Sequence, residues 1–146
     1  MPHAQFPMTG GEMLLEVVIG LNEAQIQAMQ AAGLAVPPFV RLNAMLDTGT
    51  TVTAVTSPAL APLGLTPSGT AQTITAGGNV VVNYYEVSLT NLLPGAAFAP
   101  LMARGMWTVT QLLRSASGLD AILGMDVIRE GLLIVDGPNQ YFTLAF

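Results

Sequence analysis

The 146-residue sequence contains no cysteine, no lysine and only one histidine, His3. Without cysteine there is no disulfide framework, no thiolate nucleophile and no Cys-ligated metal site. The single histidine excludes a His-rich metal site and leaves serine nucleophiles without their usual imidazole base. Carboxylates are therefore the groups left for acid–base chemistry, and the chain has nine of them.

Basic residues and long apolar runs are also scarce. Four arginines stand against a formal net charge of -5, so the chain lacks a surface that neutralises phosphates, and we expect no nucleic-acid partner. No apolar run is long enough for a membrane span, and residues 1–11 lack the basic and apolar regions of a signal peptide. These absences predict a soluble, cytoplasmic protein without a membrane span.

Length and composition predict a single domain. With 51% hydrophobic residues the chain can bury one core, but it is too short for two comfortable domains. The ten prolines and fifteen glycines are spread along the sequence, which is typical of short strands joined by turns. We expect a flexible N-terminus over residues 1–10 and one mostly β domain with one or two short helices over residues 11–146.

One helix is predicted over about residues 22–33, as an insertion among the strands. Asn22 and Gln25 have the spacing of a capping box, and Gly33 suits the left-handed residue that ends a helix. The apolar side chains expected to form its buried stripe are Ile26, Met29 and Ala32.

The remaining apolar segments predict strands, because they alternate with polar residues or are rich in β-branched side chains. In chain order they are 12–20, 40–47, 71–75, 80–89, 98–102, 106–112, 121–123, 132–136 and 141–146. The glycine-containing residues 77–79 are expected to turn a hairpin, and 125–130 predicts a second, brief helix.

Two short motifs distinguish the chain from a generic β domain. Residues 44–50 read Ala-Met-Leu-Asp-Thr-Gly-Thr, and residues 121–126 read Ala-Ile-Leu-Gly-Met-Asp. With the hairpin between them, the ordered set resembles the single-domain, retropepsin-like members of the aspartic peptidase superfamily, over about residues 40–146. The Asp-Thr-Gly triplet alone is a weak signal because its residues are common, whereas the ordered set is more specific.

The resemblance implies a retropepsin-like acid protease fold, active as a two-fold homodimer, with Asp47 as the catalytic carboxylate of each subunit. It assigns supporting roles at the active site to Thr48, Gly49 and Thr50. It places the flap over the substrate at Ala76, Gly77, Gly78 and Asn79. The structural apolar-Gly segment would be Ile122, Leu123 and Gly124, and Asp126 would also be structural.

Physical chemistry agrees with this assignment. Peptide hydrolysis without a metal or a nucleophilic side chain needs a water held between two carboxylates, one ionised and one protonated. The chain has one Asp-Thr/Ser-Gly triplet, so the second carboxylate must come from a second copy through an isologous interface. We expect an extended polypeptide as substrate and no metal or cofactor. The apolar segment 141–146, an exposed edge otherwise, is expected in the interface.

Thr50 adds a prediction about pH. A hydroxyl that donates to the ionised carboxylate favours the ionised form, so we expect maximal activity at acidic pH.

Other interpretations remain open at this stage. The fold also suits a catalytically inactive dimerisation or peptide-binding module, because a fold does not guarantee chemistry. A carboxylate-pair glycosidase would need a second acid in the site, and the sequence offers no candidate. The glycines at 77–78 also fit an ordinary hairpin turn, and Trp107 is expected in the core.

Overall fold

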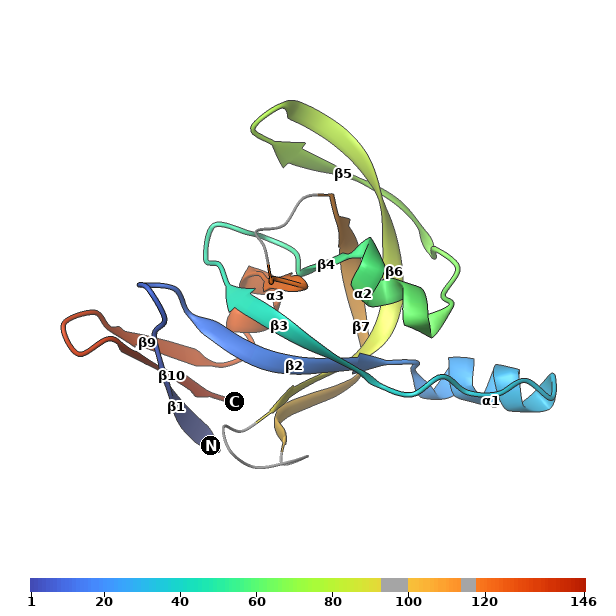
Figure 1. The fold of residues 1–146 in the computed structure, drawn as a ribbon, viewed down its shortest axis with the longest axis horizontal. Helices are drawn as coiled ribbons and strands as arrows, with labels where there is room; N and C mark the ends of the chain where they lie inside the picture. The colour runs from blue at the N-terminus through green and yellow to red at the C-terminus, as the bar shows by residue number, and fades with distance from the viewer. Residues whose placement is uncertain (93–99, 114–117) are drawn as a thin grey trace.

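The computed structural model describes residues 1–92, 100–113 and 118–146, and within them the chain is mostly β (Figure 1). The strands are β1 (His3–Pro7), β2 (Leu14–Gly20), β3 (Val40–Leu46), β4 (Ala54–Thr56), β5 (Gly69–Thr75), β6 (Gly78–Leu92), β7 (Pro100–Leu112), β8 (Ala121–Leu123), β9 (Leu132–Asp136) and β10 (Tyr141–Ala145). The helices are α1 (Glu23–Ala31), α2 (Ser57–Leu60), the 3-10 turn η1 (Ala61–Leu63) and α3 (Met125–Ile128). None of these described helices is long and apolar enough to cross a membrane.

A seven-stranded sheet forms the body of the molecule. Its order is β2-β3-β8-β4-β7-β6-β5, and β2 also pairs with β6. This extra pairing closes six strands into a small barrel and leaves β5 at an edge. Strands β3 and β8 run parallel, with Leu46 opposite Leu123, so the residues that follow the two strands emerge at the same end of the barrel.

The core follows from the alternation predicted for β3. Leu42, Ala44 and Leu46 are buried, while Arg41 and Asn43 face solvent. Alternate residues of a strand point to opposite faces of the sheet, so one face of β3 joins the core cluster. The strand is thereby held firmly up to the residue before Asp47.

The prediction of a flexible N-terminus over residues 1–10 is wrong for the segment that forms β1. This strand pairs antiparallel with β10, from His3 opposite Ala145 to Pro7 opposite Tyr141. Phe6 is buried and stacks on Phe142 with ring centroids 5.0 Å apart. The pairing joins opposite ends of the chain, which a local sequence pattern does not reveal.

The segment 141–146 was expected to be an exposed edge, and this expectation is also wrong. Strand β10 is the middle strand of a separate three-stranded sheet of order β1-β10-β9. Its backbone hydrogen-bonding groups are engaged on both sides, by β1 and by β9. The free edges of this small sheet are therefore β1 and β9.

Helix α1 begins and ends as predicted. Asn22 and Gln25 form the capping box through hydrogen bonds of 2.8 and 2.9 Å, and Gly33 has a φ of 70° beyond the end of the helix. The predicted buried stripe is wrong in part: Ile26 and Met29 are only half-buried against the core, and Ala32 is exposed. The helix extends from one side of the barrel, where few neighbours can cover it (Figure 1).

The strand prediction needs correction at β7 and at the hairpin turn. A single strand, β7, spans the segment for which two strands were expected, because β6 is long enough to pair along it with two register shifts. Residues 98 and 99 of the first expected strand lie outside the described residues. The hairpin turn was expected at 77–79, but Thr75 pairs with Gly78, so the loop consists of Ala76 and Gly77.

Candidate active site

Asp47 directly follows β3 and is half-buried at the end of the barrel. Its Oδ1 accepts a hydrogen bond from the Gly49 N–H at 2.8 Å, and its Oδ2 accepts one from the Thr50 hydroxyl at 2.8 Å. Its own N–H donates to the Leu123 carbonyl at 3.0 Å. The carboxylate is therefore oriented by donors on both oxygens and by the neighbouring strand β8.

Gly124 holds the loop after Asp47 against α3. The loop carbonyls of Thr50 and Thr51 accept hydrogen bonds from the N–H groups of Met125 at 2.7 Å and Asp126 at 3.0 Å. A Cβ atom on Gly124 would lie 2.8 Å from the Thr50 carbonyl oxygen. Backbone atoms cannot yield as a flexible side chain can, so this close approach requires glycine.

The other predicted residues of this region take different positions. Thr48 and Gly49 are exposed, whereas Thr50 is half-buried. Leu123 is fully buried in the core, and Ile122 lies beside the cavity described next. The structure thus brings Asp47, Thr50 and the 122–124 segment together.

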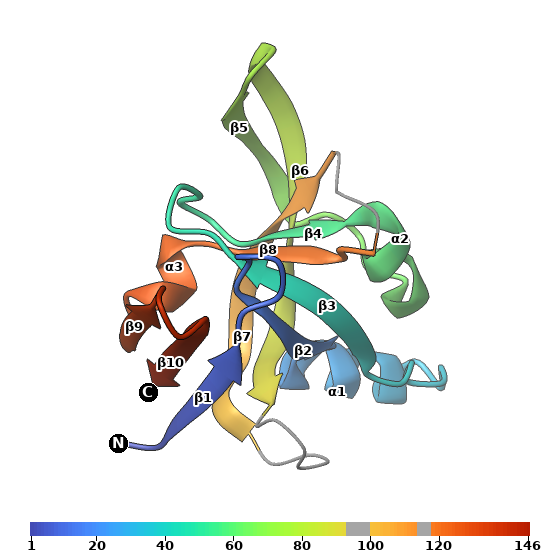
Figure 2. The same ribbon diagram turned by 60° about the vertical axis from the view of Figure 1, so that its left-hand side comes forward.

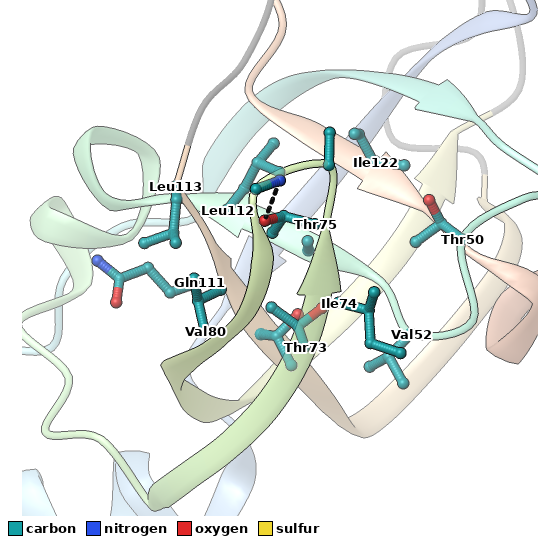
Figure 3. A pocket seen from close by; sticks show the side chains of 14 residues that line it. Thr50, Val52, Thr73, Ile74, Thr75, Val80, Gln111, Leu112, Leu113 and Ile122 are labelled. Carbon is teal, nitrogen blue, oxygen red and sulfur yellow. Dashed lines mark hydrogen bonds between the residues drawn. The ribbon is translucent and has the colours of Figure 1, made fainter.

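A cavity of about 570 Å³ lies between the hairpin β5–β6 and the end of the barrel (Figure 3). Thr50 connects it to the Asp47 carboxylate, because Thr50 both lines the cavity and donates to Asp47. Among the residues that the structure describes, the lining includes no ionisable side chain. They are Thr50, Val52, Ala54, Thr73, Ile74, Thr75, Ala76, Gly77, Val80, Thr110, Gln111, Leu112, Leu113 and Ile122.

The hairpin tip forms one wall of this cavity. Of the four residues predicted for the flap, Ala76 and Gly77 line the cavity, and Gly78 and Asn79 do not. The Thr75 hydroxyl accepts a hydrogen bond from the Gly77 N–H and donates one to the Gly78 carbonyl, so the tip is braced by its own residues. The hairpin extends well beyond the barrel (Figure 2).

The carboxylates of Asp120, directly before the second motif, and of Asp126, its last residue, are hydrogen-bonded to other groups. Asp120 accepts a hydrogen bond from the Asn43 N–H at 2.9 Å. Asp126 accepts hydrogen bonds from Thr53 and from the Trp107 indole. Across the three described segments, no group of three or more His, Asp or Glu side chains is arranged to hold a metal ion.

Sequence reasoning missed much of the cavity wall. Val52 before β4, Ala54 in β4, and Thr110 and Leu112 on β7 were not predicted as site residues. The only available signal was the threonine-rich run directly after Asp47, which places residues 50–54 near the carboxylate. The contribution of β7 depends on its parallel pairing with β4, which joins segments far apart in the chain.

Comparison with known proteins supports the architecture. No family model matches the chain, and neither does any curated protein. Among solved structures, the chain is similar to a retropepsin-like aspartic protease from Rickettsia conorii, with a TM-score of 0.59 over 97% of this chain and 89% of that chain. The two chains have similar folds. At 12% sequence identity the likeness confirms the predicted mostly β, retropepsin-like fold and extends no further.

Proposed function

We propose that the protein is an aspartic endopeptidase in which two copies of the chain each contribute Asp47. The observation that carries the proposal is the Asp47 carboxylate, oriented by Gly49 and Thr50 beside a cavity under a hairpin whose described lining residues carry no charge. The similar fold of a retropepsin-like aspartic protease supports the same reaction class.

The proposed chemistry needs a pair of carboxylates. One ionised carboxylate accepts a proton from a bound water, while its protonated partner polarises the scissile carbonyl; like charges at close range share one proton in this way. All nine acidic residues of the chain lie in the described segments, and none of the eight besides Asp47 is among the residues that line the cavity. We therefore assign the second carboxylate to the Asp47 of a partner copy. Thr48, which is exposed, is then free to reach the partner's loop.

Strand β9 is the edge best suited to join the two copies. Leu132 and Ile134 are 51% and 53% exposed, and β9 carries no charge before Asp136 and no proline. The opposite edge, β1, is flanked by Pro2 and ends at Pro7, and proline is a common protection of edge strands. The small sheet and the loop after β3 face the same side of the molecule in both views (Figures 1 and 2). Antiparallel pairing of β9 with its copy would then bring the two Asp47 loops toward a common axis.

The cavity indicates which substrates fit. An extended peptide between the hairpin and the barrel can add to the sheet as a strand, with alternate side chains directed into pockets. The part of the wall that the structure describes combines aliphatic side chains with threonine hydroxyls and has no ionisable group. We therefore expect apolar, uncharged side chains beside the cleaved bond.

The direct test is cleavage of a peptide library and of unfolded proteins between about pH 3 and pH 7 by the wild-type chain and by Asp47→Asn. We expect wild-type cleavage with an acidic optimum and sensitivity to pepstatin. Asp47→Asn should lower the rate by about 10²–10⁴-fold, the usual contribution of an acid–base group, while the protein stays dimeric. Absence of wild-type cleavage over this whole range would instead support an inactive dimerisation or peptide-binding module.

A further inference from the structure

The Asp126 carboxylate accepts four hydrogen bonds beside the loop that follows Asp47. Its Oδ1 accepts from the Thr53 N–H at 3.0 Å, from the Thr53 hydroxyl at 2.8 Å and from the Val127 N–H at 3.0 Å. Its Oδ2 accepts from Trp107 Nε1 at 3.1 Å. The carboxylate therefore links three elements: α3, the start of β4 and the middle of β7.

Thr53 transmits this link to the active-site loop. The residue is completely buried, and every polar atom in it has a partner. Besides its bonds to Asp126, its hydroxyl accepts from the Gly124 N–H at 3.1 Å, and its carbonyl accepts from the Thr110 N–H at 2.9 Å. Any shift of Asp126 must therefore move Thr53, and with it the loop that carries Thr50.

Trp107 contributes more to this site than core packing. Its ring is half-buried against the core, as expected for a tryptophan, but its N–H donates to Asp126 and not to solvent. The same strand, β7, continues to Gln111 and Leu112, which line the cavity. The Trp107 side chain thus links β7, which forms part of the cavity wall, to Asp126, which positions the loop of Asp47.

We propose that Trp107 is a positioning residue: through Asp126 and Thr53 it fixes the loop of Asp47 relative to the cavity wall formed by β7. Its catalytic consequence rests on the proposed peptidase function, whereas its effect on the loop does not. A hydrogen bond to a charged acceptor is stronger than one between neutral groups. Loss of the indole N–H should therefore displace Asp126, and with it Thr53 and Thr50.

The test compares Trp107→Phe, which removes the N–H and keeps an aromatic ring, with Met106→Leu on the same strand. Met106 is 65% exposed and serves as the matched control. In ¹⁵N-labelled full-length protein, we expect Trp107→Phe to shift the backbone amide signals of Gly49 and Thr50, and Met106→Leu to leave them in place. The wild type has one tryptophan, so its single indole N–H signal can be followed directly, and Asp126→Asn should displace it.

In a cleavage assay well below the unfolding temperature, Trp107→Phe should lower kcat about tenfold with KM changed less than twofold, because displacement of a reacting group affects the chemical step. Trp107→Phe combined with Asp126→Asn should be no slower than Asp126→Asn alone, since the link is already broken. Unchanged Gly49 and Thr50 signals in Trp107→Phe would overturn the proposal, as would a lower unfolding temperature with wild-type kcat. If the wild type cleaves nothing, the amide signals alone decide the proposal, and only the peptidase function fails.

Discussion

The loop around Asp47 and the tip of the β5–β6 hairpin face the same cavity but are built in opposite ways. The loop is held by hydrogen bonds to distant residues, from Leu123 to Asp126, and buries Thr53 completely. The hairpin tip is exposed from Ile74 to Asn79, and its side-chain hydrogen bonds stay within the tip. Under the proposed function, a catalytic carboxylate needs a fixed geometry and a flap must open without disturbing the body, and the two constructions suit these separate needs.

Gly124→Ala should have the largest effect, because it changes the tightly packed contact with the loop of Asp47. The new Cβ would lie 2.8 Å from the Thr50 carbonyl oxygen and 3.0 Å from the Val52 carbonyl carbon. We expect a loss of about 1–3 kcal/mol in the free energy of unfolding, as for other overpacked sites, together with displacement of Asp47. Urea unfolding measures the first effect and cleavage rates the second.

The matched control is Gly105→Ala on β7, where a Cβ would meet nothing within 4 Å among the described residues. It should unfold at the same urea concentration as the wild type or slightly above it, because alanine restricts the unfolded chain. Equal behaviour of the two variants would contradict the tight fit assigned to the loop.

Thr50→Val should leave the fold intact and weaken the orientation of the carboxylate. The variant keeps the shape of the side chain and loses the 2.8 Å hydrogen bond to Asp47 Oδ2. Hydrogen bonds to charged groups contribute about 1.5–3 kcal/mol, so we expect kcat to fall by about tenfold or more.

Thr51→Val provides the control for that experiment. Thr51 is exposed, and its hydrogen bond to Asp126 uses the main-chain carbonyl, which the substitution keeps. Its kcat should match that of the wild type. If Thr51→Val lowers kcat as much as Thr50→Val does, the role given to the Thr50 hydroxyl is wrong.

Gly78→Ala tests the tip of the β5–β6 hairpin, where we expect the loss of stability to stay within the hairpin. Gly78 has a φ of 108°, which alanine adopts only with strain of about 1–3 kcal/mol. We expect faster amide hydrogen exchange in residues 72–81 and little change in the global unfolding free energy. Gly77→Ala, whose Cβ would meet only the Thr75 hydroxyl at 3.7 Å, should exchange like the wild type. A global loss of stability in Gly78→Ala would show that the hairpin is not independent of the body.

The smallest effect is expected at the β9–β10 turn, which belongs to neither region. Hydrogen bonds from the side chain and then the backbone of Asn139 hold the pKa of Asp136 below its ordinary value of 3.8. Because the pKa of Asp136 is lower in the folded than in the unfolded state, its ionised carboxylate stabilises the fold at pH values above the unfolded-state pKa. This contribution is lost as the pH falls through the folded-state pKa. Asn139→Ala should therefore unfold at a slightly lower temperature than the wild type at pH 7, and the difference should shrink toward pH 2. A difference that grows in acid would contradict this assignment.

Elements that depend on residues close together in the sequence could be predicted. The capping box at Asn22 and the alternation in β3 were sufficient to predict the helix and the strand, and the order of the Asp47 and Gly124 motifs was sufficient to predict the retropepsin-like fold. The contact between the loop of Asp47 and Gly124 was not predicted. What escaped prediction depends on pairing between distant segments: β1 with β10, the Trp107–Asp126 hydrogen bond, and the cavity wall from β7. Periodicity reports which face of a strand is buried, and it does not report which strand lies beside it.

Mixing wild-type chains with Asp47→Asn chains tests the central claim most directly. If the active site needs one Asp47 from each of two copies, equal amounts of the two chains, once exchanged, should retain about one quarter of the cleavage rate of the same total of wild type, because only dimers of two wild-type chains cleave. A rate of about one half, in proportion to the wild-type chains present, would contradict the account, since each chain would then act alone.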